Sequence, residues 1–211
     1  VKSVYLRERP GVLDELSSRS GPLREQWQAC GLGVLVQVAR RCPTEFLVDS
    51  ADLALLQPVL GGAGTAHPLY NSASIEAVLT NPIADLPEVC RLAWLVAQLQ
   101  LDRPDFQGDE PRERALWLGA MGLVPVVLSA AAEVELIRYD ERLLGSALER
   151  WFQGQAYSWG PVPEPAAVPT LLSWYEVYSS RRPSWPAAMR ALAQMLTDES
   201  ADAQQGSAPL P

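Results

Sequence analysis

The segment that most constrains the fold is residues 85–101, which is apolar on nearly every side of a helix. Its only polar line is formed by Arg91 and Gln98, which lie seven residues and two turns apart. A helix of this kind cannot lie on a surface without exposing a large apolar patch. The sequence therefore predicts a buried central helix, whose apolar residues are Val89, Cys90, Leu92, Ala93, Trp94, Leu95, Val96, Ala97 and Leu99.

The start of this helix has the pattern of a capping box. The carboxylate of Asp85 can accept the N–H of the third residue on, and Glu88 can reach back to the N–H of Asp85. Pro87 stands in the first turn, where the missing N–H of proline has no cost. We therefore expect the two acidic side chains to cap the helix.

Three short β-strand patterns precede the central helix. Residues 45–49 and 53–60 are short, largely apolar segments. In residues 74–80, apolar side chains alternate with mostly polar ones. Pro58 indicates an edge strand or the end of a strand. Residues 61–64 read Gly-Gly-Ala-Gly and predict a flexible turn. One small three-stranded sheet is therefore expected.

Helical patterns fill most of the remaining chain. The first expected helix begins near Pro22, which suits a first turn, and ends before Pro43. Residues 154–169 are rich in proline and predict an extended loop. The expected helices are 22–41, 111–122, 125–138, 140–153, 170–180 and 184–197.

These elements predict an α+β fold that is mostly helical. A small three-stranded sheet packs on the buried central helix, and the C-terminal half is helical. We expect one domain over residues 1–197, with the sheet in residues 22–101 and the helical part in residues 111–197. Residues 198–211 are polar and are predicted to be disordered.

Residues 115–132 form an uncharged run of 18 residues, at the lower limit for a membrane span. Two glycines, Pro125, Ser129 and five alanines dilute its hydrophobicity, and no basic cluster flanks only one of its ends. The pattern therefore favours a core helix over a membrane segment.

The three cysteines are odd in number and far apart, which excludes a disulfide framework. No signal-peptide pattern opens the chain, so a cytoplasmic protein is expected. The net charge of −8 makes nucleic acid a poor partner. Sixteen of the 17 basic residues are arginine, which is typical of a GC-rich bacterial genome.

Patterns for catalysis, metals and cofactors are missing from the sequence. His67 is the only histidine, and no serine stands in a Gly-x-Ser-x-Gly turn. Cys30 and Cys42 lack the paired spacing of a zinc site. The glycine-rich turn at 61–64 has no following lysine, unlike a nucleotide-binding loop. We therefore predict no metal and no cofactor, and lean against an enzyme.

Half of the sixteen aromatic residues fall between positions 151 and 185, next to an arginine pair. Tryptophan, tyrosine and arginine often dominate protein interfaces. The alternative is that the rings pack the last helices onto the body. On the first interpretation the candidate interaction surface comprises Trp159, Trp174, Tyr175, Arg181 and Arg182.

The expected order of a helix (22–41), three strands (45–49, 53–60 and 74–80) and a buried helix (85–101) resembles the N-terminal half of zincin metalloproteases, in which an edge strand precedes the active-site helix. The run LAWLVAQL is similar to the zincin pattern Leu-Ala-His-Glu-Leu-x-His-Leu. Trp94 and Gln98 fall on the two metal-binding histidines, and Leu95 falls on the general-base glutamate. The resemblance covers about residues 22–101, and implies a scaffold without the metal or peptidase chemistry.

The sequence thus favours a non-catalytic protein that acts through contacts with an unknown protein partner. The alternative is an enzyme, such as a hydrolase, with a site between the sheet and the central helix. The polar candidates for that site are Arg91, Gln98, His67, Tyr70 and Asn71.

Overall fold

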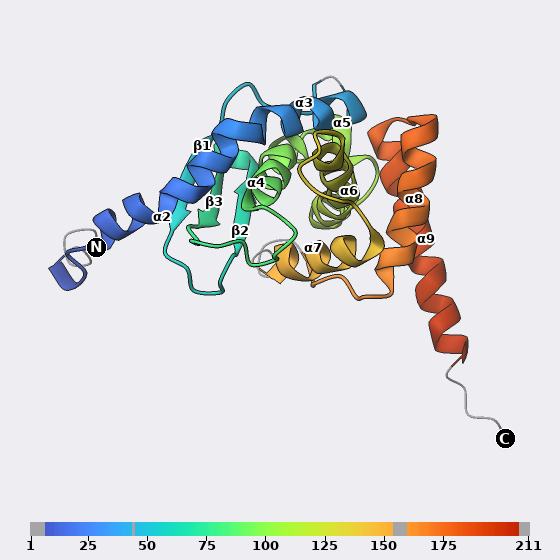
Figure 1. The fold of residues 1–211 in the computed structure, drawn as a ribbon. Coiled ribbons are helices and arrows are strands. Elements are labelled where there is room, and N and C mark those ends of the chain that lie inside the picture. The colour runs from blue at the N-terminus through green and yellow to red at the C-terminus, as the bar shows by residue number, and fades with distance from the viewer. Residues whose placement is uncertain (1–6, 44, 154–159, 207–211) are drawn as a thin grey trace.

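Helix α4 (Glu88–Ala97) is the centre of the structure, a computed structural model that describes residues 7–43, 45–153 and 160–206. Every residue of α4 except Val96 is buried. The indole of Trp94 has no exposed surface, and its Nε1 donates to the carbonyl of Ala120 at 2.9 Å. Figure 1 shows α4 between the sheet and the helical half. The predicted central helix is therefore where the two halves meet.

The predicted capping box at the start of α4 is wrong. Pro87 precedes the helix, and the N–H groups of Glu88 and Val89 bond to the side-chain oxygens of Asn81 and Gln26. Gln26 also donates to Asn81 at 3.1 Å. The two amides replace the local carboxylates because the first helix packs against this end of α4 and brings Gln26 there.

The sheet has three strands, in the order β1-β3-β2. Strand β1 pairs in parallel with β3, and β2 pairs antiparallel with β3. Their bounds are β1 (Asp52–Leu56), β2 (Gly64–His67) and β3 (Ser72–Glu76), with a 3-10 turn η2 (Pro68–Tyr70) between β2 and β3.

Two of the predicted strands are present with different bounds, and the third is elsewhere. Residues 45–49 form no strand, because Phe46 is a fully buried core residue in a turn, packed on Phe106 and Trp185. The missed strand, β2, begins in the predicted flexible turn. A Cβ at Gly64 would come within 2.7 Å of Leu95 on α4. Close packing therefore requires small residues in β2. Because glycine and alanine have low strand propensity, the sequence pattern did not predict this strand.

A buried carboxylate organises the loop between β1 and β2. Glu76 accepts the N–H groups of Val59, Leu60, Gly62 and Ala63 at 2.7–3.0 Å. The loop turns around this side chain, so β1 ends at Leu56 rather than at residue 60.

The first helix is longer than predicted, because it begins ten residues earlier. It consists of α2 (Val12–Gln26), a π-helical turn η1 (Trp27–Gly31) and α3 (Leu32–Arg41). Pro22 lies inside α2 instead of starting the helix. A Cβ at Gly31 would meet the ring of Trp27 at 2.6 Å, so glycine lets the indole lie against the backbone of the turn.

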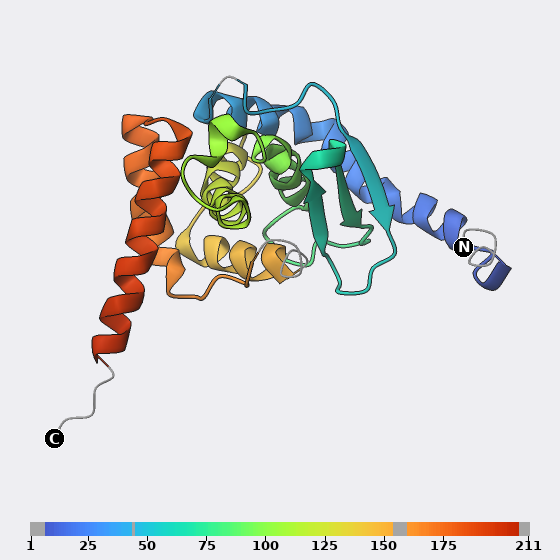
Figure 2. The ribbon, with the colours of Figure 1, turned by 180° about the vertical axis from the view of Figure 1, so that it is seen from behind.

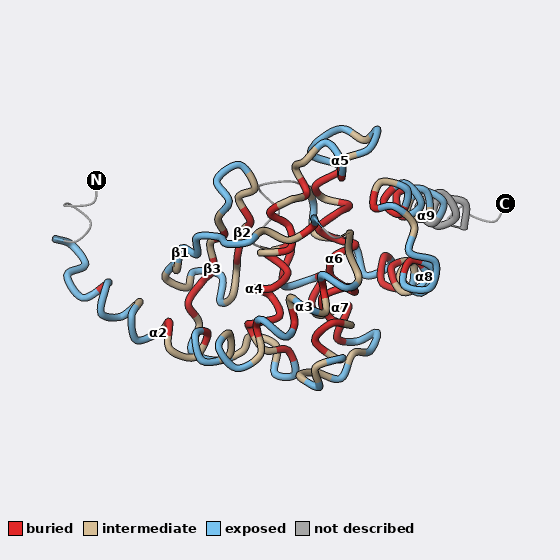
Figure 3. The backbone as a smooth tube through the Cα atoms, turned by 90° about the horizontal axis from the view of Figure 1, so that it is seen from above, coloured by how far each residue is buried: buried red, intermediate tan, exposed pale blue. Residues whose placement is uncertain are grey.

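A single helix, α6 (Arg112–Glu133), replaces the two predicted on either side of Pro125. Helices α3, α4, α7, α8 and α9 pack around it. It is long and apolar enough to cross a membrane, but 83% of its apolar window is buried inside the fold. This burial fits a soluble protein, and Figure 3 shows buried residues gathered at α4 and α6 in the middle of the molecule.

The other helical elements complete the shell around α6. They are η3 (Gln98–Gln100), α5 (Pro104–Gln107), α7 (Glu141–Gln153), α8 (Ala167–Arg181) and α9 (Trp185–Gly206). Figure 2 shows α8 and α9 side by side at the end of the molecule opposite the sheet. The α+β, mostly helical prediction is confirmed. Helix α9 continues beyond residue 197, where the domain was expected to end.

Candidate functional site

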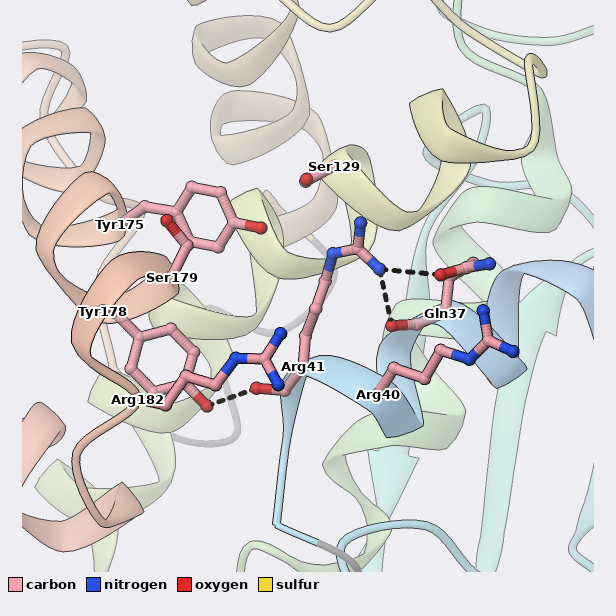
Figure 4. Close-up of a pocket in the computed structure, with 8 residues that line it drawn as sticks. All are labelled: Gln37, Arg40, Arg41, Ser129, Tyr175, Tyr178, Ser179 and Arg182. Atoms are coloured by element: carbon pink, nitrogen blue, oxygen red, sulfur yellow. Dashed lines mark hydrogen bonds between the residues drawn. The ribbon is translucent and has the colours of Figure 1, made fainter.

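A cavity of about 370 Å³ opens between the C-terminal end of α3, helix α6 and helix α8. We call it the arginine pocket, because three arginines contribute to its wall and no acidic residue does. Figure 4 shows these side chains with hydroxyl groups around the same space. The lining residues are Gln37, Arg40, Arg41, Ser129, Tyr175, Tyr178, Ser179 and Arg182.

Aromatic packing fixes α8 against α3 at this pocket. The hydroxyl of Tyr178 donates to the carbonyl of Arg41 at 2.7 Å. The ring of Tyr178 stacks on Trp174 with centroids 5.1 Å apart, and Trp185 meets it edge-on. Trp174 in turn donates from Nε1 to the carbonyl of Ala188 at 2.9 Å. The two walls are therefore held together by buried rings.

The guanidinium of Arg41 is held by neighbours. It donates to the backbone carbonyl and the side-chain oxygen of Gln37 at 2.9 and 3.0 Å. Its other nitrogen is 3.4 Å from a carboxylate oxygen of Glu133, whose side chain is exposed. An ion pair that is this long and exposed offsets the charge of Arg41 only weakly.

The other two arginines, Arg40 and Arg182, have no ion-pair partner within the described part of the chain. Both are exposed at the pocket. Arg182 caps α8 in the left-handed conformation, with φ 47° and ψ 54°, and its N–H donates to the carbonyl of Tyr178. Glycine is the usual residue at such a cap, because a side chain there is strained. An arginine here therefore points to a role for its side chain.

The groups behind the pocket are poor bases and nucleophiles. Burial raises the pKa of the Cys42 thiol to about 12, against smaller opposing effects of Tyr178 and Arg41. Burial also raises the pKa of the Tyr178 hydroxyl well above its usual range. Both groups stay protonated at neutral pH, so neither of them supplies an anionic nucleophile.

The predicted interaction surface is divided by the structure. Tyr175 and Arg182 line the arginine pocket, whereas Arg181 is exposed on α8 outside its lining. Trp174 is only 2% exposed and belongs to the core. Trp159 lies outside the described residues.

Sequence reasoning missed Arg40 and Arg41, the half of the pocket that α3 provides. The only signal was an arginine pair at the end of an expected helix, about 140 residues from Arg182 in the sequence. Adjacent arginines are usually a solvated helix end, so nothing in the sequence linked the two pairs.

The five polar residues predicted for an enzyme site do not converge. Arg91 of α4 and Gln98 of η3 are buried, and Tyr70 is 79% exposed. His67 shares a hydrogen bond with Ser74 within the sheet, at 3.1 Å. Asn71 donates to the carbonyl of Ser50 at 2.7 Å. None of the five cavities that we compared among the described residues is lined by more than one of these side chains.

The described residues contain no group of three or more His, Cys, Asp or Glu side chains that could hold a metal ion. The three cysteines are free. No family model, curated protein or solved structure matches the chain, so the resemblance to zincins rests on the sequence alone.

Proposed function

We propose that this chain is a non-catalytic protein that acts through protein–protein contacts, with the arginine pocket anchoring an acidic group of its partner. The observation that supports this most is that three arginines, Arg40, Arg41 and Arg182, line one cavity whose wall holds no acidic residue. In a chain of net charge −8, such a local excess of positive charge is unusual.

The pocket chemistry suits a carboxylate on a protein. Arginine presents parallel N–H donors that match the two oxygens of a carboxylate. A volume of about 370 Å³ accommodates one or two side chains of a bound segment. The hydroxyl of Tyr175, which points toward the cavity, offers a further donor. We therefore favour an acidic peptide segment, with glutamate or aspartate entering beside Arg41 and Arg182.

Two further parts of the proposal depend on chemistry outside the pocket. Free cysteines are typical of a reducing compartment, which supports a cytoplasmic location. The net negative charge opposes nucleic acid as the partner. The zincin-like run on α4 is interpreted as a scaffold without a metal site, since Trp94 and Gln98 stand where the ligands would be.

The test is the binding of a fluorescein-labelled decapeptide that contains four glutamates, measured by anisotropy at two salt concentrations. The decisive variant is Arg182→Gly, because glycine suits the left-handed cap and the protein should remain folded. We expect binding to weaken by about tenfold or more, as for the loss of a charge-assisted hydrogen bond. Arg40→Ala should have a similar effect.

The matched control is Arg181→Ala, which removes the same charge one residue away and outside the pocket lining. Its effect should be below about twofold, in line with a screened surface charge. An equal loss with Arg181→Ala and Arg182→Gly would show non-specific attraction and contradict the proposal. Absence of peptide binding to the wild-type protein would contradict it as well.

A further inference from the structure

Strand β1 leaves one edge of the sheet open. It is an outer strand and pairs only with β3 (Figure 1). The N–H of Asp52 and the carbonyl of Leu56 bond to β3 or the residue next to it. Because backbone groups alternate along a parallel strand, those of Leu53 and Leu55 point to the other edge. Within the described residues no backbone partner meets that edge.

This edge lacks most of the features that usually protect an open strand, and its one charged residue is Asp52 at the beginning of β1. Residues 52–56 contain no lysine, no proline and no bulge. Leu53 is 41% exposed and Leu56 is 45% exposed, so apolar surface lies on both faces of the strand. An apolar strand with free backbone groups is a template for pairing with another extended segment.

An apolar groove of about 390 Å³ lies on the helix-facing side of the same strand. Its wall includes Leu53 and Leu55 from β1 and the half-buried indole of Trp27 from the π-helical turn. Leu92 and Val96 of α4 form another part of the wall. Side chains that project toward the helices from a strand added to β1 would therefore enter an apolar groove.

Charge at the groove favours a basic residue in the bound segment. Asp49 and Asp52 line it and have no ion-pair partner among the described residues, and Arg24 is the one basic residue in its lining. The carboxylates stand at the beginning of β1, so they would meet one end of an added strand.

We infer that β1 and this groove form a second binding site, which takes an extended segment of a protein partner as a fourth strand of the sheet. Backbone hydrogen bonds to Leu53 and Leu55 hold the segment. Alternate apolar side chains fill the groove, and a lysine or arginine pairs with Asp49 or Asp52. The site is separate from the arginine pocket and does not depend on the function proposed for it.

The test begins with selection from random decapeptides displayed on phage, using the wild-type protein as bait. We expect enrichment of peptides that alternate apolar and polar residues and carry a basic residue. The enriched peptide should bind Leu53→Glu at least about tenfold more weakly, because the new charge enters the apolar groove. Ala54→Glu is the matched control, since it adds the same charge at an exposed position on the opposite face of the strand, next to Ser74, and it should change affinity less than about twofold.

Two N-methylated forms of the enriched peptide test the backbone pairing. Methylation of one alternate set of N–H groups removes the bonds to β1 and should abolish binding, whereas methylation of the other set should preserve it. Equal binding of both forms would show a groove that takes apolar side chains without strand pairing, and would overturn the inference. Absence of enrichment would also overturn it.

Two further results separate this site from other possibilities. Binding of the enriched peptide should survive Arg182→Gly, which tests only the arginine pocket. Sedimentation of the free protein tests whether a second copy covers the edge. A dimer that Leu53→Glu dissociates, with no peptide selected, would assign the edge to self-association and overturn the inference.

Discussion

Helix α6 and strand β1 are both strongly apolar in sequence, yet α6 is buried in the fold and β1 is largely exposed. In α6 the run from Leu118 to Leu128 is buried without interruption, because helices α3, α4, α5, α7, α8 and α9 pack around it. In β1 four of five residues are exposed, because the strand has one neighbour in the sheet. Apolar composition therefore does not decide burial. Burial depends on how many other elements pack against a segment. Strand β1, which remains exposed, is therefore the candidate for binding.

The same contrast appears in the polar groups. On the helical side Trp94 and Trp174 direct their indole N–H groups to backbone carbonyls inside the fold. On the sheet side the backbone groups of Leu53 and Leu55 are directed outward. A buried donor with a partner stabilises the folded state, whereas an open strand edge leaves its bonds for water or a partner.

The largest expected effect is on the helical side. Trp94→Ala should lower the free energy of unfolding by about 3–5 kcal/mol, because it leaves a cavity in a close-packed core. Leu53→Ala on β1 should cost less than about 1 kcal/mol, since that side chain is partly in water already. Urea melts measure both. Similar costs for the two variants would remove the contrast between the regions.

The next effect concerns Glu76, which holds the loop beside β1. Glu76→Ala should cost about 2–3 kcal/mol, because four backbone N–H groups lose their acceptor. The measurement is again the midpoint and slope of a urea melt. A change below about 0.5 kcal/mol would show that water replaces the carboxylate without penalty.

The pH dependence of stability tests the same residue. Burial by itself raises the pKa of Glu76, but the four backbone hydrogen bonds outweigh it, and the pKa lies below its ordinary value of 4.5. A carboxylate with a lowered pKa stabilises the fold above its unfolded pKa. This stability is lost as pH falls through the folded pKa, so the loss begins below about pH 4.5. Glu76→Gln should flatten this part of the stability curve relative to wild type.

A smaller effect is expected where the sheet side and the helical side join. Asn81→Ala should cost about 1 kcal/mol, because the N–H of Glu88 loses the oxygen that caps α4. Asp85→Ala is the control, since Asp85 caps nothing and forms an exposed ion pair with Arg142. If Asp85→Ala lowered the melting temperature more than Asn81→Ala, the result would support the capping box predicted from the sequence.

The smallest expected effect is that of metal removal. Elemental analysis should find no stoichiometric zinc, and a chelator should leave the melting temperature unchanged, because the described residues bring no three metal-binding side chains together. One zinc per chain that only a chelator removes would contradict this prediction and also the interpretation of α4 as a scaffold without metal.

The sequence by itself determined the elements whose pattern is local and strong. The run that is apolar on nearly every side predicted α4 as the central helix. The excess of helical over strand patterns predicted a mostly helical α+β fold. It also placed two of the three strands approximately. These predictions succeeded because helical periodicity and apolar runs are read from neighbours in the sequence.

Only the tertiary structure decided the features that depend on distant residues. Asn81 and Gln26 cap α4 because α2 packs there, and β2 begins with Gly64 because Leu95 leaves no room for a larger residue at that position. The arginine pocket joins Arg40 to Arg182, which no spacing rule connects. Local propensities are worth a few tenths of a kcal/mol per residue, while packing and desolvation are worth several. Contacts between distant segments therefore set the cap, the missed strand and both candidate sites.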